Sequence, residues 1–360
     1  MAAKQAGATL SPELLDALRD GLAIPAHPLA LDESRRLDEA SQRALSRYYI
    51  ASGAGGIAVG VHSTQFEIRD PEHSLLETVL RMAAEEVERA RLDRPFLMVA
   101  GVCGPTEQAL REAELARSLG YGAALLSMGG LAGWSERELL ERTRQVAERM
   151  PVIGFYLQSS VGGRRLSYAF WREFADIPNV VAIKMAPFNR YQTLDVVRAV
   201  CSSPRRDEIA LYTGNDDNIV ADLLTTFRFT IDGEIVEKTI VGGLLGHWAV
   251  WTRNAVELLE EIKRVRKGAS ISREWLTWAA QVTDANAAFF DPAHGFEGCI
   301  PGIHEVLRRQ GLMKGIWCLN PQETLSPGQR EEIDRVYAQY PHLNDDAFVA
   351  AHLSDWLDEA

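Results

Sequence analysis

The segment Val180-Val181-Ala182-Ile183-Lys184 is a short, continuous apolar run that ends in a single lysine. Apolar runs of this length predict buried strands, because a strand covered on both faces has no polar side to alternate. The starts of such runs lie about 30 residues apart, which is typical of a strand–helix–strand unit. The other seven runs are Leu22–Ala26, Gly56–Gly60, Phe96–Gly101, Ala123–Ser127, Val152–Tyr156, Glu208–Tyr212 and Ile240–Leu244.

The segments between these runs are amphipathic and predict helices. Ser74–Arg91 and Ser135–Met150 each open with a serine followed three residues later by a glutamate, which predicts a capping box. Thr106–Leu119 opens with a threonine that we expect to cap its helix. Eight strands alternating with helices predict a closed (β/α)8 TIM barrel, in the α/β class. An open doubly wound sheet is the alternative, but no G-x-G-x-x-G follows the first strand.

Two further regions stand apart from this alternation. Phe227–Lys238 alternates around Asp232-Gly233 and predicts a β-hairpin inserted before the last strand. His247–Lys267 predicts one long helix that completes the barrel, so we assign residues 1–268 to a catalytic barrel. We assign residues 269–360 to a C-terminal helical region. Its expected helices are Ser270–Phe290, Ile300–Gln310, Ser326–Tyr340 and Asp345–Leu357.

Composition excludes several classes of partner. The 360 residues carry 50 acidic and 38 basic side chains, a formal charge of -12, without a basic stripe. Nucleic acid and anionic membrane surfaces are therefore not expected as partners. Four cysteines without C-x-x-C spacing predict a reduced, cytoplasmic protein. We expect no membrane span, since no apolar run approaches 18 residues, and the N-terminal stretch has no secretory pattern.

Chemistry in such a barrel is expected at the carboxyl ends of the strands. Burial of Lys184 at a strand end would lower its pKa and supply a neutral amine that forms a Schiff base with a ketone. Tyr156 ends the preceding strand 28 residues earlier. We expect the two side chains to lie side by side, with the phenol relaying protons. The alternatives are a lysine that reaches solvent or pairs with Asp216, and a tyrosine that only packs.

Several segments together resemble one family. PVIGFY and NVVAIK, ending at Tyr156 and Lys184, have its spacing, and the likeness extends over nearly the whole chain. The chain is similar to the dihydrodipicolinate synthase / N-acetylneuraminate lyase family of Schiff-base aldolases. The other similar segments are Gly56–Glu67 (GIAVGVHSTQFE), Phe96–Gly104 (FLMVAGVCG), Tyr212–Asp217 (YTGNDD) and Ile300–Leu312 (IPGIHEVLRRQGL).

The resemblance implies roles for individual residues. Lys184 matches the Schiff-base lysine and Tyr156 the catalytic tyrosine. Ser63 and Thr64 match the hydroxyl pair that binds the keto-acid carboxylate. Leu244 matches a position whose backbone carbonyl faces the substrate. The further expected substrate contacts are His62, beside the hydroxyl pair, and Gly214, at the end of the seventh strand.

The sequence also departs from the family pattern. His62 replaces a glycine, and Val161 stands where an arginine would hold a second carboxylate. Ser127–Gly130 lacks the tyrosine expected to complete a proton relay across a subunit contact. These changes make lysine-synthesis activity doubtful and predict a different acceptor aldehyde or substrate tail.

We therefore predict a lyase of the class I aldolase type. It would act on pyruvate or a related 2-keto acid through an imine on Lys184, without a cofactor or a metal, and assemble as a homo-oligomer, either a dimer or a tetramer. A dehydratase or hydratase using the same lysine is one alternative. A non-catalytic barrel is another. A metal-dependent aldolase or hydrolase is the third, with His27, His62 and His247 near strand ends as candidate ligands.

Overall fold

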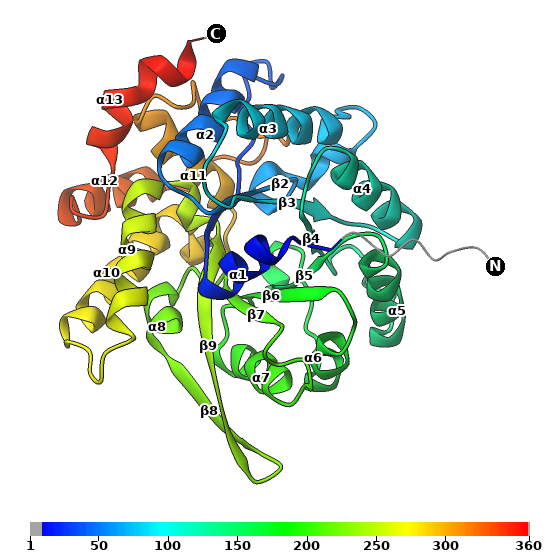
Figure 1. Cartoon of the computed structure of the whole chain (residues 1–360). Helices are drawn as coiled ribbons and strands as arrows, with labels where there is room; N and C mark the ends of the chain where they lie inside the picture. The colour runs from blue at the N-terminus through cyan, green and yellow to red at the C-terminus, as the bar shows by residue number, and fades with distance from the viewer. Residues whose placement is uncertain (1–8, 359–360) are drawn as a thin grey trace.

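A nearly closed (β/α)8 barrel forms the body of the protein, as the alternation of apolar runs predicts (Figure 1). The computed structural model describes residues 9–358. The strands neighbour one another in the order β1-β9-β7-β6-β5-β4-β3-β2, and Ala26 bridges Ala58 where the ring closes. The strands are β1 (Ala23–Pro25), β2 (Gly56–Val59), β3 (Leu97–Val102), β4 (Ala123–Leu126), β5 (Val152–Leu157), β6 (Val180–Ala186), β7 (Ala210–Thr213), β8 (Thr226–Ile231) and β9 (Glu234–Leu245).

One helix follows each barrel strand and covers the outside of the ring. Before the first strand, α1 (Pro12–Asp20) packs Leu18 against the apolar interior of the barrel, and the Tyr212 hydroxyl donates to the Leu18 carbonyl at 2.8 Å. This helix therefore closes the amino-terminal end of the barrel and leaves the opposite end for a site. The surrounding helices are α2 (Glu39–Ala51), α3 (Leu76–Ala90), α4 (Thr106–Ser118), α5 (Glu136–Ala147), α6 (Tyr168–Ala175), α7 (Arg190–Cys201), α8 (Ile219–Leu224) and α9 (Thr252–Val265).

Three expected helix starts are wrong in detail and one is confirmed. The Ser135–Glu138 capping box opens α5 as predicted. Ser74 caps nothing, because its backbone adopts a φ of 48° and its hydroxyl donates to Pro71 instead. Thr106 is already the first residue of α4. The long helix from His247 is interrupted at Trp251, whose φ of 52° separates a short 3-10 turn from α9.

The hairpin predicted near Asp232-Gly233 is present as an antiparallel pair. Its second strand, β9, is 12 residues long and continues directly into the barrel. Figure 1 shows the hairpin extending away from the ring beyond α7 and α8. The insertion is therefore a long extension of the last barrel strand.

The C-terminal helices pack on the barrel. The Tyr48 hydroxyl of α2 donates to Asp345 at 2.7 Å, just before α13. Asn286 of α10 donates to the backbone carbonyl of Asp216 at 2.6 Å, at the end of β7. The C-terminal region therefore reaches the mouth of the barrel. The helices are α10 (Glu274–Phe290), α11 (Cys299–Arg309), α12 (Gln329–Gln339) and α13 (Asp346–Leu357).

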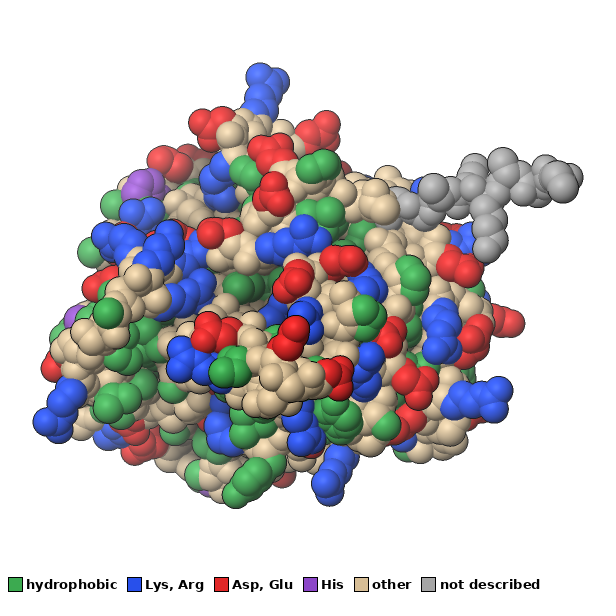
Figure 2. Space-filling view, turned by 60° about the horizontal axis from the view of Figure 1, so that its bottom comes forward, with side chains coloured by type: hydrophobic (Ala, Val, Ile, Leu, Met, Phe, Trp, Pro, Cys, Tyr) green, Lys and Arg blue, Asp and Glu red, His purple; other side chains and the backbone are tan. Residues whose placement is uncertain are grey.

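The surface mixes charges of both signs. Figure 2 shows Lys and Arg interspersed with Asp and Glu over the face in view. Among residues 9–358, no helix is both long and apolar enough to span a membrane. The ends of the two assigned regions, residues 1–8 and 359–360, lie outside the described residues. Residues 1–8 include most of the N-terminal stretch for which no secretory pattern is expected.

Candidate active site

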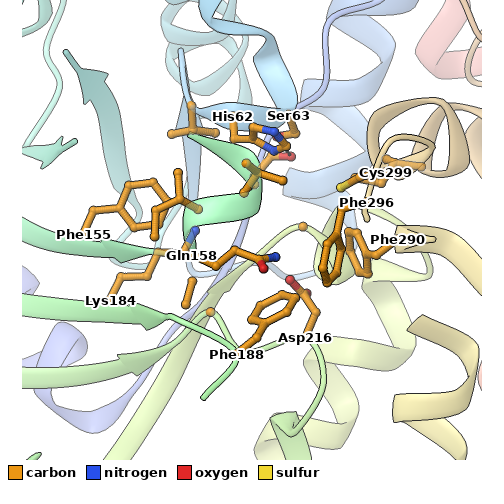
Figure 3. Close-up of a pocket in the computed structure, with 18 residues that line it drawn as sticks. His62, Ser63, Phe155, Gln158, Lys184, Phe188, Asp216, Phe290, Phe296 and Cys299 are labelled. Atoms are coloured by element: carbon orange, nitrogen blue, oxygen red, sulfur yellow. Dashed lines mark hydrogen bonds between the residues drawn. The ribbon is translucent and has the colours of Figure 1, made fainter. Parts of the chain in front are cut away.

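A cavity of about 550 Å³ lies at the carboxyl ends of the barrel strands (Figure 3). It brings together Lys184 and Asp216, with His62 and Ser63 on another part of the wall. Most of its remaining surface is apolar. Those other residues are Ala26, Val61, Phe155, Leu157, Gln158, Val161, Ala186, Phe188, Gly214, Gly246, Phe290, Phe296, Cys299 and Ile303.

Lys184 is buried at 7% exposure near the end of β6, with its Nζ 4.3 Å from the centre of the Phe155 ring. Within the described residues it has no carboxylate partner closer than 4 Å. Burial lowers the pKa of this amine to about 8, and the negative charge of Asp216 partly opposes the shift. A neutral amine is therefore accessible near neutral pH, which is the state that attacks a carbonyl carbon.

The lysine needs Gly214 to occupy this position. A Cβ at residue 214 would lie 2.5 Å from Lys184 Cε and 2.9 Å from Ala186 Cβ. A real Cβ does not approach another carbon so closely, so any side chain at this position would displace the lysine. The expectation that Gly214 lies at the site agrees with its place in the cavity wall.

Asp216 supplies the acidic group of the cavity. It follows β7, and its Oδ1 accepts a hydrogen bond from the His247 backbone N–H at 3.0 Å. Burial raises the pKa of this carboxyl to about 7, more than the His247 bond and Lys184 lower it. Lys184 and Asp216 therefore form a coupled pair, and burial favours the neutral amine and the neutral carboxyl.

Tyr156 does not lie beside Lys184, and that prediction is wrong. A spacing of 28 residues pairs Val152 with Val180, but the register between β5 and β6 shifts by one residue directly after this pair. Beyond the shift, Phe155 is the partner of Lys184. Because side chains alternate across a strand, a one-residue slip moves each of them to the opposite face.

Tyr156 consequently faces the helices outside the barrel. Its ring packs against Trp171 at 5.1 Å between centroids, and its hydroxyl lies 3.3 Å from both the N–H and the carbonyl oxygen of Leu166. Burial raises the pKa of the phenol. The position beside the lysine where a phenol was expected holds the phenyl ring of Phe155.

Of the two expected hydroxyl groups, only that of Ser63 belongs to a residue in the cavity wall. Ser63 lines the cavity, although its hydroxyl donates to the Ala26 carbonyl at 2.8 Å. Thr64 does not line the cavity and is fully buried. Its Oγ1 donates to the His27 carbonyl at 2.7 Å and accepts from the Gly60 N–H at 3.0 Å. The expectation that Thr64 binds a carboxylate is therefore wrong, because its hydroxyl fixes the loop after β2.

His62 lies in the cavity as expected. Burial, followed by the nearby charge of Lys184, lowers the pKa of the imidazole to about 4. The ring is therefore neutral at physiological pH and can act as a hydrogen-bond donor or acceptor to a ligand.

Leu244 does not reach the cavity. Its side chain is fully buried in the barrel interior, and its partner across the sheet is Ile24. The cavity wall instead contains Gly246, two residues further on. The contact expected from the Leu244 backbone carbonyl is therefore wrong, because neither the side chain nor the backbone of this residue belongs to the cavity wall.

The candidate metal ligands are not brought together. His27 is fully buried between the Pro28 carbonyl at 2.8 Å and the Ser46 hydroxyl at 2.9 Å. His247 stacks against Phe289. Within the described part of the chain, no three His, Cys, Asp or Glu side chains gather where they could hold a metal ion.

Comparison with known proteins fixes the family. The model of the Dihydrodipicolinate synthetase family matches residues 22–233, more than half of the chain. The chain belongs to this family. A 4-hydroxy-tetrahydrodipicolinate synthase from Clostridium novyi (strain NT) is 29% identical over 116 residues, which are 32% of this chain. This chain thus spans 38% of that relative's length.

Solved structures of other members share the fold. Dihydrodipicolinate synthase from Oceanobacillus iheyensis has a TM-score of 0.70 at 18% identity, covering 90% of this chain and 97% of its own. The Acinetobacter baumannii synthase, solved with pyruvate, has a TM-score of 0.70 at 18% identity over 89% of this chain and 99% of its own. N-acetylneuraminate lyase from Fusobacterium nucleatum has a TM-score of 0.68 at 16% identity, with 89% and 98% covered.

The site of this family member contains residues that the sequence interpretation did not assign to it. Gln158 follows β5, and its side-chain amide has no hydrogen-bond partner among the described residues. From the sequence, Asp216 is expected only as an ion-pair partner of Lys184. Phe290, Phe296 and Cys299 come from the C-terminal region. Nothing in the local sequence of that region points to a barrel mouth more than 70 residues earlier in the chain.

Proposed function

We propose that the protein is a Schiff-base lyase or aldolase that acts on pyruvate or a related 2-keto acid through Lys184. The observation that carries the proposal is a buried amine of lowered pKa that shares a cavity with a buried carboxyl of raised pKa. Such a pair combines a nucleophile with a proton carrier. Family membership supports the same class of reaction.

The first step is imine formation. The neutral Lys184 amine attacks the keto carbon, the carbinolamine loses water, and the resulting imine takes up a proton. Its nitrogen then accepts the electron pair released when a proton leaves the neighbouring carbon. The product is an enamine whose carbon can form a new C–C bond.

Asp216 takes the role that Tyr156 cannot fill. As a carboxylate it accepts the proton from the carbon beside the imine, and as a carboxylic acid it returns a proton to the oxygen of the second substrate. A pKa near the working pH suits both directions. The His247 N–H at 3.0 Å orients the carboxyl during both transfers.

Neutral groups would hold the keto-acid carboxylate. Ser63, His62 and the Gln158 amide offer hydrogen-bonding atoms in the cavity wall. Lys184 is the only Lys or Arg among the described residues of the wall, and it becomes part of the imine. Hydrogen-bond donors can bind a carboxylate without adding a fixed positive charge beside the amine.

Borohydride trapping tests the proposal. The protein is incubated with pyruvate, reduced, digested and analysed by peptide mass. We expect an adduct on Lys184, and none in Lys184→Met. If a broad panel of keto acids gives no adduct on a folded protein, the lyase proposal fails and the non-catalytic barrel is favoured.

A further inference from the structure

Three phenylalanines form an apolar recess on the side of the cavity that contains Asp216 (Figure 3). Phe188 lies in the loop after β6, Phe290 ends α10, and Phe296 lies in the loop before α11. The rings of Phe188 and Phe296 are 5.6 Å apart and inclined by 66°. A neighbouring hollow of about 340 Å³, open to solvent, shares these three rings and Asp216 with the cavity. The three rings offer apolar surface against which an aryl ring or a branched alkyl group can pack.

The backbone holds two of these rings in an uncommon conformation. Phe188 has a φ of 49° and Phe296 a φ of 73°, in the left-handed region that bulky residues rarely adopt. The Phe188 N–H donates to Asn215 Oδ1 at 3.1 Å, and the Phe296 N–H donates to the Asp291 carbonyl at 2.9 Å. Such conformations persist where the surrounding structure enforces them, and they cluster at ligand sites.

The hollow beside the cavity carries acidic side chains and, among its described residues, no basic ones. This hollow, of about 1130 Å³ and open to solvent, shares His62, Val161, Phe296 and Cys299 with the cavity. Its described wall contains Glu297 and Glu323 but no lysine or arginine. An acidic tail on the second substrate that extended into this hollow would therefore meet carboxylates, and inside the cavity it would find no cation except the lysine that forms the imine.

We infer that the second substrate is an uncharged aldehyde bearing an aryl or branched alkyl group, seated among Phe188, Phe290 and Phe296. This inference rests on the proposed aldolase function. The Lys184 enamine carbon attacks the aldehyde carbon and forms a C–C bond, and the carbonyl π pair moves to the aldehyde oxygen. That oxygen takes the proton from Asp216. Water then hydrolyses the imine, which restores the amine and releases a 4-hydroxy-2-keto acid.

Matched aldehydes test the inference. With pyruvate as donor, kcat/KM is compared for benzaldehyde, the carboxylate-bearing succinic semialdehyde and the polyhydroxylated erythrose. We expect benzaldehyde to exceed both by at least tenfold. Phe296→Ala should lower kcat/KM for benzaldehyde about tenfold, while Tyr191→Ala, exposed on α7, should not change it. If pyruvate is trapped on Lys184 but either polar aldehyde is preferred, the inference is overturned and the aldolase proposal stands.

A binding measurement covers the case in which no imine forms. Saturation-transfer NMR compares benzyl alcohol with 1,4-butanediol on the wild-type protein and on Phe296→Ala. Binding of benzyl alcohol alone, weakened by Phe296→Ala, supports an apolar recess that accepts aryl groups even if the lyase proposal has failed. Equal signals from the two alcohols, or binding of benzyl alcohol that is unaffected by the substitution, would contradict it.

Discussion

Replacing Asp216 with asparagine separates proton transfer from imine formation. Asparagine keeps the shape of the side chain and an Oδ1 that can accept the His247 N–H, now 3.0 Å away. It removes the group that carries the proton. Loss of a positioned acid–base group lowers a rate roughly 10²–10⁴-fold, or about 3–5 kcal/mol in the barrier.

The same substitution should favour imine formation, because it lowers the pKa of Lys184. The charge of Asp216 raises the lysine pKa, so its removal lets burial lower that pKa further below its ordinary value. More of the amine is then neutral at pH 7. We therefore expect pyruvate trapping in Asp216→Asn to be at least as complete as in the wild type.

Exchange of the pyruvate methyl protons with deuterated solvent, followed by ¹H NMR, measures the affected step without a second substrate. Asp216→Asn should slow this exchange roughly 10²–10⁴-fold, while pyruvate is still trapped on Lys184. Asp195→Asn, an exposed carboxyl on α7, is the matched control and should not alter exchange. Exchange within about threefold of the wild type in Asp216→Asn would refute the assignment of the proton carrier.

Three further predictions follow from individual contacts. Gly214→Ala should reduce pyruvate trapping at least tenfold in a folded protein, because its Cβ would lie 2.5 Å from Lys184 Cε; undiminished trapping would show that the lysine can move aside. Tyr156→Phe should leave proton exchange within about twofold of the wild type, because among the described residues the Tyr156 hydroxyl bonds only to Leu166. The loss of that hydrogen bond should lower the free energy of unfolding by about 0.5–1.5 kcal/mol. A large loss of exchange would instead show that the phenol carries the proton. Acid should destabilise the fold between pH 7 and pH 5, measured by urea unfolding. Buried histidines with folded pKa values of about 4 bind protons more readily when unfolded, so their contribution to stability is full above about pH 6.5 and falls below it by roughly 2 kcal/mol per histidine at pH 5. The three buried residues are His27, His247 and His304. Asp216, with a folded pKa of about 7, acts in the opposite sense and offsets roughly the loss from one histidine. An unchanged free energy of unfolding would contradict the prediction.

The barrel could be predicted because strand and helix periods are local properties of the chain. Every apolar run singled out in the sequence overlaps a barrel strand, and the Asp232-Gly233 turn identified the hairpin. Lys184 could be found because it ends an apolar run, where removing an ammonium group from water is energetically costly. These signals depend only on neighbouring residues.

The site residues that the sequence did not predict depend on the register between strands and on contacts between distant segments of the chain. A one-residue shift between Val152 and Ile153 exchanges Phe155 for Tyr156 beside Lys184, and spacing alone does not reveal such a shift. Phe296 reaches the cavity only because the C-terminal helices fold back over the barrel mouth. A sequence pattern can therefore place the nucleophile here, while its partners require the three-dimensional arrangement.

A crystal structure of the protein soaked with pyruvate tests the central claim most directly. The account predicts continuous electron density between Lys184 Nζ and the former keto carbon, with the carboxylate beside Ser63, His62 or Gln158. Pyruvate bound with a separate, unmodified lysine, or Lys184 engaged in a direct ion pair with Asp216, would contradict it.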